Sequence, residues 1–369
     1  MEIILDNSWQ DIKEIFVYGN GKISRKNLPI LKNIIDVRNV IDRISEDGAI
    51  TLEDALRYRI DEKIIVSANK EAYKSISRDL VDAGLVEYVD YIKLDDFLMY
   101  WMYQFRKKNC IREVHYSINT KCDFKCKKCN MFMTYYKESF MYNEEDVETD
   151  LELFFAAIDF VMTFSFLGGE PFINPRLEDI LNTTYMKFGE KIGRIELYTN
   201  GSVIPNEELL STMKKCNVFI RISDYTEQIA YSHKLKQFED ILSSYGIPYE
   251  ISKDMRWLDF KFPDESLSKP YNDIREHMLM CSPAFHGLND GKFYYCHVCW
   301  SAEKAKLFQL KDTDYIDLRK VDSSEKKRQV VYFANGEIEN EGRYITLCQF
   351  CAGCGDDNKE TVVAAEQIK

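Results

Sequence analysis

The sequence predicts an α/β protein with a metal-binding part, on three observations. β-rich segments alternate with amphipathic helical segments over most of the 369 residues. Hydrophobic residues make up 45% of the chain and charged residues 30%, which is typical of a globular protein. The 11 cysteines are gathered in groups, a distribution that suggests metal ligands. We expect three domains, at residues 1–107, 108–265 and 266–369.

The first domain, residues 1–107, is expected to be a small Rossmann-like α/β unit. Strands are predicted at residues 14–19, 38–43 and 62–69, and helices at 25–34 and 70–85. Gly19-x-Gly21-x-x-Ser24 joins the first strand to the first helix, and Asp42 follows at the distance of a dinucleotide-binding turn. Serine replaces the third glycine of that turn. A docking or scaffolding domain that keeps the turn for packing is therefore the alternative.

The second domain, residues 108–265, repeats a strand followed by a helix. The predicted strands are residues 112–119, 162–171, 194–201, 217–225 and 248–254, and the predicted helices are 151–161, 176–190, 206–216 and 233–246. Such a repeat predicts a parallel sheet or a partial barrel. Polar residues and glycines follow the strand ends, where folds of this kind bind ligands.

The overall charge and the hydrophobic pattern exclude several classes of partner. The net charge of −12 argues against a broad surface for nucleic acid or anionic membranes. No run of eighteen apolar residues predicts a membrane span, and the acidic N-terminal segment lacks the pattern of a signal peptide. We therefore expect a cytoplasmic protein, in which clustered cysteines bind metal rather than form disulfides.

Three cysteines, Cys122, Cys126 and Cys129, follow the first strand of the repeat in the spacing C-x3-C-x2-C. A tetrahedral zinc site needs a fourth ligand, and only Cys110 and His115 are near in sequence. A 4Fe-4S cluster held by three thiolates instead leaves one iron open for another molecule. The triple therefore favours such a cluster, with a zinc knuckle as the alternative.

This arrangement resembles the radical S-adenosylmethionine (radical SAM) enzymes. The resemblance implies a partial (β/α)6 barrel in which the open iron binds S-adenosylmethionine (SAM). In that family the reduced cluster cleaves SAM to a 5′-deoxyadenosyl radical, which removes a hydrogen atom from the substrate. Cys122, Cys126 and Cys129 would hold the catalytic cluster.

Three further motifs carry the resemblance, each at the end of a predicted strand. Gly168-Gly169-Glu170-Pro171 is similar to the glycine-rich motif that receives the methionyl amino group. By the same resemblance, contacts to the ribose, carboxylate or substrate would come from Asn200, Ser223 and Asp224. The sequence departs from the family at Lys128, where an aromatic residue that often touches adenine is usual.

The third domain, residues 266–369, is expected to be a small cysteine-rich α+β unit. An Asn-Asp-Gly turn at 289–291 predicts a β-hairpin between Cys281 and Cys296, and Cys348 and Cys351 follow as C-x2-C. The pattern resembles the twitch or SPASM extension of radical SAM enzymes, which implies one auxiliary 4Fe-4S cluster on these four cysteines. Zinc is the alternative. Cys299 and Cys354 are then either replacement ligands or free thiols.

An auxiliary cluster implies a two-electron oxidation, or an epimerisation if a free thiol returns a hydrogen atom. The glycan-associated members that the motifs resemble point to a sugar, cyclitol or glycan precursor, with a flavodoxin- or ferredoxin-type reductant. Two alternatives remain: a peptide maturase that epimerises or crosslinks a ribosomal peptide, and an iron–sulfur electron carrier or scaffold without catalysis.

Overall fold

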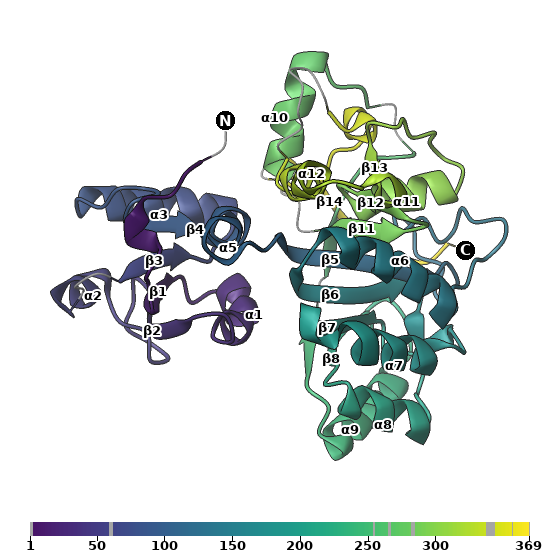
Figure 1. The fold of residues 1–369 in the computed structure, drawn as a ribbon. Coiled ribbons are helices and arrows are strands. Elements are labelled where there is room, and N and C mark those ends of the chain that lie inside the picture. The colour runs from purple at the N-terminus through teal and green to yellow at the C-terminus, as the bar shows by residue number, and fades with distance from the viewer. Residues whose placement is uncertain are drawn as a thin grey trace. The chain divides into compact units, whose positions relative to one another are not determined.

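A computed structural model describes residues 3–58, 62–253, 255–264, 267–281, 285–336, 344–355 and 357–368, with the side chains of residues 271 and 272 left out. The chain forms two compact units, Met1–Arg112 and Glu113–Lys369, whose elements Figure 1 labels. The boundary predicted between residues 265 and 266 lies outside the described residues. The predicted three-domain division therefore stays a prediction.

The first unit contains a four-stranded sheet in the order β2-β1-β3-β4, and every described strand pair is parallel. The strands are β1 (Glu14–Tyr18), β2 (Asp36–Ile41), β3 (Lys63–Val66) and β4 (Tyr91–Lys93). The helical segments are η1 (Asn7–Trp9), α1 (Lys22–Leu31), α2 (Leu52–Tyr58), α3 (Lys70–Asp82), α4 (Leu94–Asp96), η2 (Phe97–Trp101) and α5 (Met102–Arg106). The predicted α/β character is confirmed.

The glycine turn of this unit is explained by packing. Gly19 has φ +115°, and a Cβ at that position would lie 2.7 Å from the carbonyl oxygen of Ser67. The Asp42 carboxylate accepts a hydrogen bond of 2.8 Å from the backbone N–H of Asn20, inside the same turn. Gly19 and Asp42 thus both have structural roles, and nucleotide binding stays a hypothesis.

The second unit is built on an eight-stranded sheet in the order β13-β12-β11-β5-β6-β7-β8-β9. Its strands are β5 (Cys110–Asn119, which begins in the first unit), β6 (Phe160–Gly168), β7 (Ile192–Thr199), β8 (Phe219–Ser223), β9 (Tyr249–Ser252), β11 (His286–Asn289), β12 (Lys292–Tyr294) and β13 (Tyr315–Asp317). Strands β6 to β9 are parallel, as predicted, and β11 is parallel to β5. Strands β12 and β13 extend the sheet in antiparallel fashion.

Helices cover one side of the β5–β9 part of this sheet, as Figure 1 shows. They are α6 (Glu144–Ala157), α7 (Leu177–Phe188), α8 (Glu207–Lys215) and α9 (Ser232–Tyr245). The remaining helical segments are η3 (Pro171–Ile173), η4 (Gly189–Lys191), α10 (Tyr271–Cys281), α11 (His297–Lys304), η5 (Leu318–Lys320), α12 (Ser324–Ala334) and η6 (Thr346–Gln349). A two-stranded sheet joins β10 (Arg256–Leu258) to β14 (Thr361–Val363).

Helix α6 begins earlier than predicted. The apolar pattern predicted a helix at residues 151–161, but the helix starts at Glu144 because Asn143 and Asp146 form a capping box. It ends at Ala157, since Ile158 is already extended with φ −113° and ψ 129°. The apolar residues that follow belong to β6.

Strand β5 separates polar from apolar side chains. Successive side chains point to opposite faces of a strand. Tyr116 points toward the helices, because its hydroxyl donates to Asp150 of α6 at 2.8 Å. The opposite face of β5 carries a buried polar row: Glu113, His115, Ser117 and Asn119. This row faces the side of the sheet on which the site lies.

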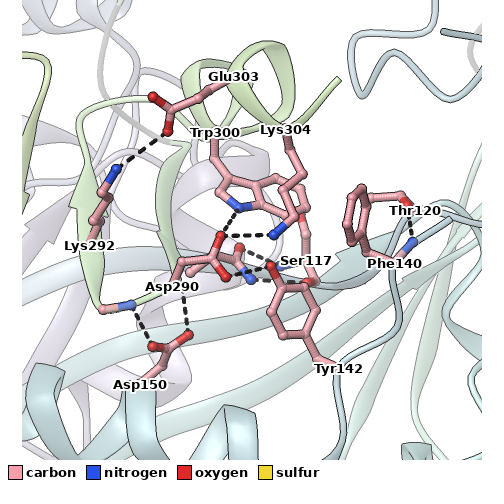
Figure 2. Close-up of polar contacts among 12 residues, drawn as sticks. Ser117, Thr120, Phe140, Tyr142, Asp150, Asp290, Lys292, Trp300, Glu303 and Lys304 are labelled. Carbon is pink, nitrogen blue, oxygen red and sulfur yellow. Dashed lines mark hydrogen bonds and ion pairs between the residues drawn. The ribbon is translucent and has the colours of Figure 1, made fainter. Parts of the chain in front are cut away.

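The predicted hairpin is present, and α6 anchors it, as Figure 2 shows. Asp290 and Gly291 form its two-residue turn with φ of 57° and 70°, as a type I′ turn requires. The Asp150 carboxylate accepts hydrogen bonds from their backbone N–H groups, at 2.9 Å and 2.6 Å. Asn289 pairs with the backbone of Ser117 on β5 at 3.0 and 3.1 Å.

The Asp290 carboxylate continues this network on the other side of the turn. It accepts from the Tyr142 hydroxyl at 2.8 Å, from Trp300 Nε1 at 3.1 Å and from Lys304 Nζ at 3.2 Å (Figure 2). Because Trp300 and Lys304 lie on α11, the network connects β5, α6, the hairpin and α11. It therefore holds Cys296 and Cys299 in place relative to the first cysteine loop.

Replacing Asp150 by alanine is expected to lower the free energy of unfolding by about 3 kcal/mol, because two buried donors and one partly buried donor lose their acceptor together. Chemical denaturation of the second unit measures this. The matched control is Glu152→Ala on the same helix, where the side chain is exposed. Equal stabilities of the two variants would contradict the anchoring role.

Candidate functional site

Both groups of cysteines that the sequence singles out lie on the wall of one cavity of about 540 Å³ in the second unit. The first group is the triple Cys122, Cys126 and Cys129, and the second comes from residues distant in the chain. The thiols of the second group are Cys281, Cys296, Cys299, Cys348, Cys351 and Cys354. Cys110 and Cys216 are not among the lining residues, although both are described and buried.

The loop that carries the triple starts directly after β5 and closes on itself. Thr120 and Phe140 are joined by hydrogen bonds of 2.9 and 2.7 Å, which Figure 2 shows in part. Burial raises the pKa of all three thiols, that of Cys126 to about 12. A thiol in such surroundings needs a metal to become a thiolate ligand.

Two glycines allow the end of β6 to reach this loop. A Cβ on Gly168 would lie 2.5 Å from the carbonyl oxygen of Asn119, and one on Gly169 would overlap the carbonyl group of Lys121. The backbones are hydrogen bonded here, from Gly169 N to Asn119 O at 3.1 Å and from Glu170 N to Lys121 O at 2.8 Å. Only glycine fits this close approach, and both glycines line the cavity.

Glu170 lies beneath the cavity wall, fully buried. Its carboxylate accepts from Thr199 Oγ1 and the backbone N–H of Asn200, both at 2.8 Å, and from Phe172 N at 3.1 Å. Burial raises its pKa from 4.5 to about 7, against the opposing effect of these donors. Glu170 thus supports the Thr199–Asn200 strand end, and neither it nor Pro171 is a lining residue.

Glu170 makes the stability of the protein depend on pH. Its folded pKa lies above its unfolded value, so its contribution to stability is fully present at low pH and is lost as the pH rises through about 7. The thermal midpoint of the wild type is therefore expected to fall more between pH 5 and pH 7 than that of Glu170→Gln. Parallel pH profiles of the two proteins would rule out the buried carboxyl as the cause.

Asn200 lines the cavity and is tied to the cysteine loop by a residue that the motifs did not reveal. Its Nδ2 donates to Asp123 Oδ1 at 3.1 Å and lies 3.9 Å from Cys122 Sγ. Ser202 Oγ donates to the other carboxylate oxygen of Asp123 at 2.6 Å. Asp123 therefore positions the first cysteine against the end of β7.

Of the other residues predicted to contact the cofactor, some line the cavity and some do not. Ser223, at the end of β8, lines the cavity, but Asp224 does not and accepts from Thr226 N at 2.8 Å. Lys128, which stands where the family usually has an aromatic residue, lines the cavity and pairs with Asp259 and Asp264 at 3.4 and 3.3 Å. The predicted cofactor contacts on the wall are Gly168, Gly169, Asn200 and Ser223.

The second group of thiols includes a contact that the spacing did not predict. Cys281 Sγ lies 3.6 Å from Cys354 Sγ, and the Cys354 backbone N–H donates to Cys281 Sγ at 3.3 Å. The Cys354 thiol is the main cause of a lowered pKa at Cys281. Cys354 is thus packed against a predicted ligand, and Cys299 lies nearby with 1% of its surface exposed.

The residues fit iron–sulfur clusters by their chemistry. Each thiol group offers soft ligands on the wall of a shared cavity, and the glycines bring backbone close to the first group. Within the described ranges, no three His, Cys, Asp or Glu side chains are arranged to hold a single metal ion. In a 4Fe-4S cluster each cysteine binds a different iron, so its ligands lie farther apart than those of one ion.

An aromatic part of the wall carries two histidines. The His115 ring lies 5.3 Å from that of His297, 5.4 Å from Phe285 and 5.7 Å from Tyr198, measured between ring centres. His115 Nε2 is 3.0 Å from a carboxylate oxygen of Glu113, while its Nδ1 has no hydrogen-bond partner among the described residues. Burial lowers the pKa of His297 to about 3, and the nearby His115 contributes a smaller part of this shift.

No protein-family model and no curated protein matches the chain. Solved structures that match include anSMEcpe with bound AdoMet and the Cp18Cys peptide, at 14% identity and a TM-score of 0.42, covering 68% of this chain and 92% of that one. BtrN in complex with AdoMet and 2-DOIA matches at 16% identity and a TM-score of 0.40, covering 68% and 97%. SuiB of Streptococcus suis bound to S-adenosylmethionine matches at 16% identity and a TM-score of 0.33, covering 61% of this chain and 45% of that one.

All three were solved with bound S-adenosylmethionine (AdoMet). The TM-scores of these three matches are below 0.5. Within the part of the chain that the structure describes, no helix is long and apolar enough to cross a membrane.

Proposed function

We propose that the chain is a radical SAM enzyme that oxidises a hydroxyl-bearing small molecule, such as a sugar, cyclitol or glycan precursor. The observation that carries the proposal is the shared cavity, whose wall holds Cys122, Cys126 and Cys129 together with the second group of thiols. When bound, a 4Fe-4S cluster on the triple and SAM would supply the hydrogen-abstracting radical, and an auxiliary cluster would accept the second electron. A flavodoxin- or ferredoxin-type protein would supply the first electron.

The chain's own residues would prepare this reaction in two ways. Gly168 and Gly169 bring the end of β6 against the cysteine loop on the cavity wall, and Asn200 adds a polar side chain to that wall. The aromatic side chains around His115 provide flat surfaces on which a ring-shaped substrate can stack.

His115 is the residue that we propose to accept the hydroxyl proton. Glu113 fixes the tautomer, because its carboxylate accepts the proton on Nε2 and so leaves Nδ1 with a free lone pair. Nδ1 is buried and has no hydrogen-bond partner among the described residues, so a substrate hydroxyl that reached it would supply the missing partner. Conversion of a carbinol to a ketone would then balance: the SAM-derived radical would take one hydrogen atom from carbon, His115 would take the hydroxyl proton, and an auxiliary cluster held by the second group of thiols would accept one electron.

Epimerisation needs a thiol that returns a hydrogen atom instead. The candidates are Cys299 and Cys354, but Cys354 already lies 3.6 Å from Cys281. Oxidation is therefore the version that the geometry favours.

The first test is incubation of the anaerobically reconstituted protein with SAM and dithionite. We expect 5′-deoxyadenosine and methionine, with faster formation when a panel of sugars and cyclitols contains a substrate. Tightly bound zinc and intact SAM would overturn the proposal and favour a redox scaffold. Faster cleavage with ribosomal peptides alone would favour a peptide maturase.

With a substrate found in that panel, His115→Gln is expected to lower oxidised product by about 100-fold, the usual size of a general-base effect. Formation of 5′-deoxyadenosine should persist, because hydrogen abstraction does not need the base. His233→Gln, which alters a histidine on the exposed side of α9, is the control. Undiminished product in the His115 variant would contradict the assignment.

A further inference from the structure

A segment far along the chain crosses the loop that carries the first cysteines. We call Ala364–Ile368 the C-terminal strap. The backbone N–H of Lys127 donates to the Glu366 carbonyl at 2.6 Å, and that of Ile368 donates to the Lys125 carbonyl at 2.8 Å. Cys126 and Gln367 are paired between these bonds in an antiparallel bridge. The strap thus holds the middle of the cysteine loop as an added strand would.

The side chain of Gln367 reaches the sulfur of Cys126. Its Nε2 lies 3.1 Å from Cys126 Sγ and 2.8 Å from the carbonyl oxygen of Ala365. The orientation of the amide is determined by its neighbours, because Oε1 accepts from the backbone N–H of Lys125 at 2.8 Å. A backbone N–H can only donate, so the NH2 group has to face the sulfur.

This contact has a consequence for a metal-bound thiolate. Hydrogen bonds to ligand sulfurs are among the factors that set the potential of an iron–sulfur cluster. A donor stabilises the more negative, reduced state, so it raises the potential. Residues that hydrogen bond to a metal ligand without binding the metal also orient that ligand. Cys126 is 8% exposed, so water competes little for its sulfur.

We propose that Gln367 is a positioning residue for the catalytic cluster. It donates an amide hydrogen bond to Cys126 Sγ, one of the sulfurs that would bind the cluster. The inference rests on the proposed function, since it requires a cluster on the triple. It adds a residue that lies 241 positions from Cys126 in the sequence. Its chemical role is to make the cluster easier to reduce and slower to lose iron.

The test compares two substitutions of Gln367 that both remove the amide donor. Gln367→Glu keeps the shape and the acceptor for Lys125 N–H but replaces the donor by an oxygen, whereas Gln367→Leu removes both. Glu366→Gln is the control on the same strap, because it alters only an exposed ion pair with Lys127. The readouts are the midpoint potential of the SAM-responsive EPR signal and the rate of iron loss to a chelator.

We expect a more negative midpoint potential and faster iron loss in both Gln367 variants, with wild-type values in Glu366→Gln. Wild-type potentials in both Gln367 variants would overturn the inference, because neither variant can donate to Cys126 Sγ and Gln367→Leu adds no charge. A wild-type protein with no SAM-responsive signal would instead overturn the proposed function, and the inference with it. The two failures are therefore distinguishable.

Discussion

Replacing Cys122, Cys126 and Cys129 together by alanine is expected to lower bound iron from about eight to about four atoms per chain, one 4Fe-4S cluster out of two. The reason is that the two thiol groups line the same cavity but come from separate segments, so each can hold its cluster independently. Formation of 5′-deoxyadenosine should fall to background. Iron and sulfide analysis after anaerobic reconstitution measures the first effect, and chromatography of SAM products measures the second.

The matched control is Cys216→Ala. Cys216 is buried and its thiol contacts the carbonyl of Leu181, away from the cavity wall. Its removal should leave iron content unchanged. About four irons in the wild type and none in the triple variant would mean that the second thiol group holds zinc or nothing. The oxidation proposal would then fail, although SAM cleavage could remain.

Gly169→Ala is expected to abolish the catalytic cluster while the rest of the second unit remains folded. The added methyl group would overlap the carbonyl of Lys121 and lie 2.8 Å from the backbone nitrogen of Cys122. Both are main-chain atoms, so the cysteine loop itself has to move away. Iron content, the EPR signal and SAM cleavage should all be lost together, and circular dichroism should change little.

Gly189→Ala is the control for the effect of an added methyl group. Gly189 has φ −54°, and a Cβ there would lie 3.5 Å from the Tyr185 side chain, an ordinary contact. This variant should keep its iron and its activity. A Gly169→Ala protein that binds iron as the wild type does would show that the loop can shift, and would contradict the close-approach argument.

Local signals in the sequence predicted most of the elements. The Asn-Asp-Gly turn predicted the β11–β12 hairpin because Asp290 and Gly291 both adopt positive φ. The helix predicted at residues 70–85 is present as α3, which ends at Asp82, two residues before Gly84 with φ +81°. The start of α6 was missed because its first turn is polar and is fixed by the Asn143–Asp146 capping box rather than by apolar spacing.

The site was only partly predictable, for a physical reason. The glycine, asparagine and cysteine residues that touch the cavity follow strand ends, and strand ends of a parallel sheet meet at one edge. Asp123, Gln367 and the contact between Cys281 and Cys354 depend on segments that meet only in the folded chain. No local pattern distinguishes these residues from ordinary surface polar groups. Glu170 accepts a hydrogen bond from the Asn200 N–H, and its expected contact with the methionyl amino group stays a prediction.

The strap also bears on the order in which the protein matures. Cys126 leaves the ribosome long before Gln367, which follows 241 residues later. Until residues 364–368 have been synthesised, the middle of the cysteine loop has no partner strand, and one of its sulfurs lacks its amide donor. Iron delivered to the nascent chain would therefore meet an incomplete site. Cluster insertion is expected to follow synthesis of residues 364–368, and chains cut short before the strap should accumulate without iron.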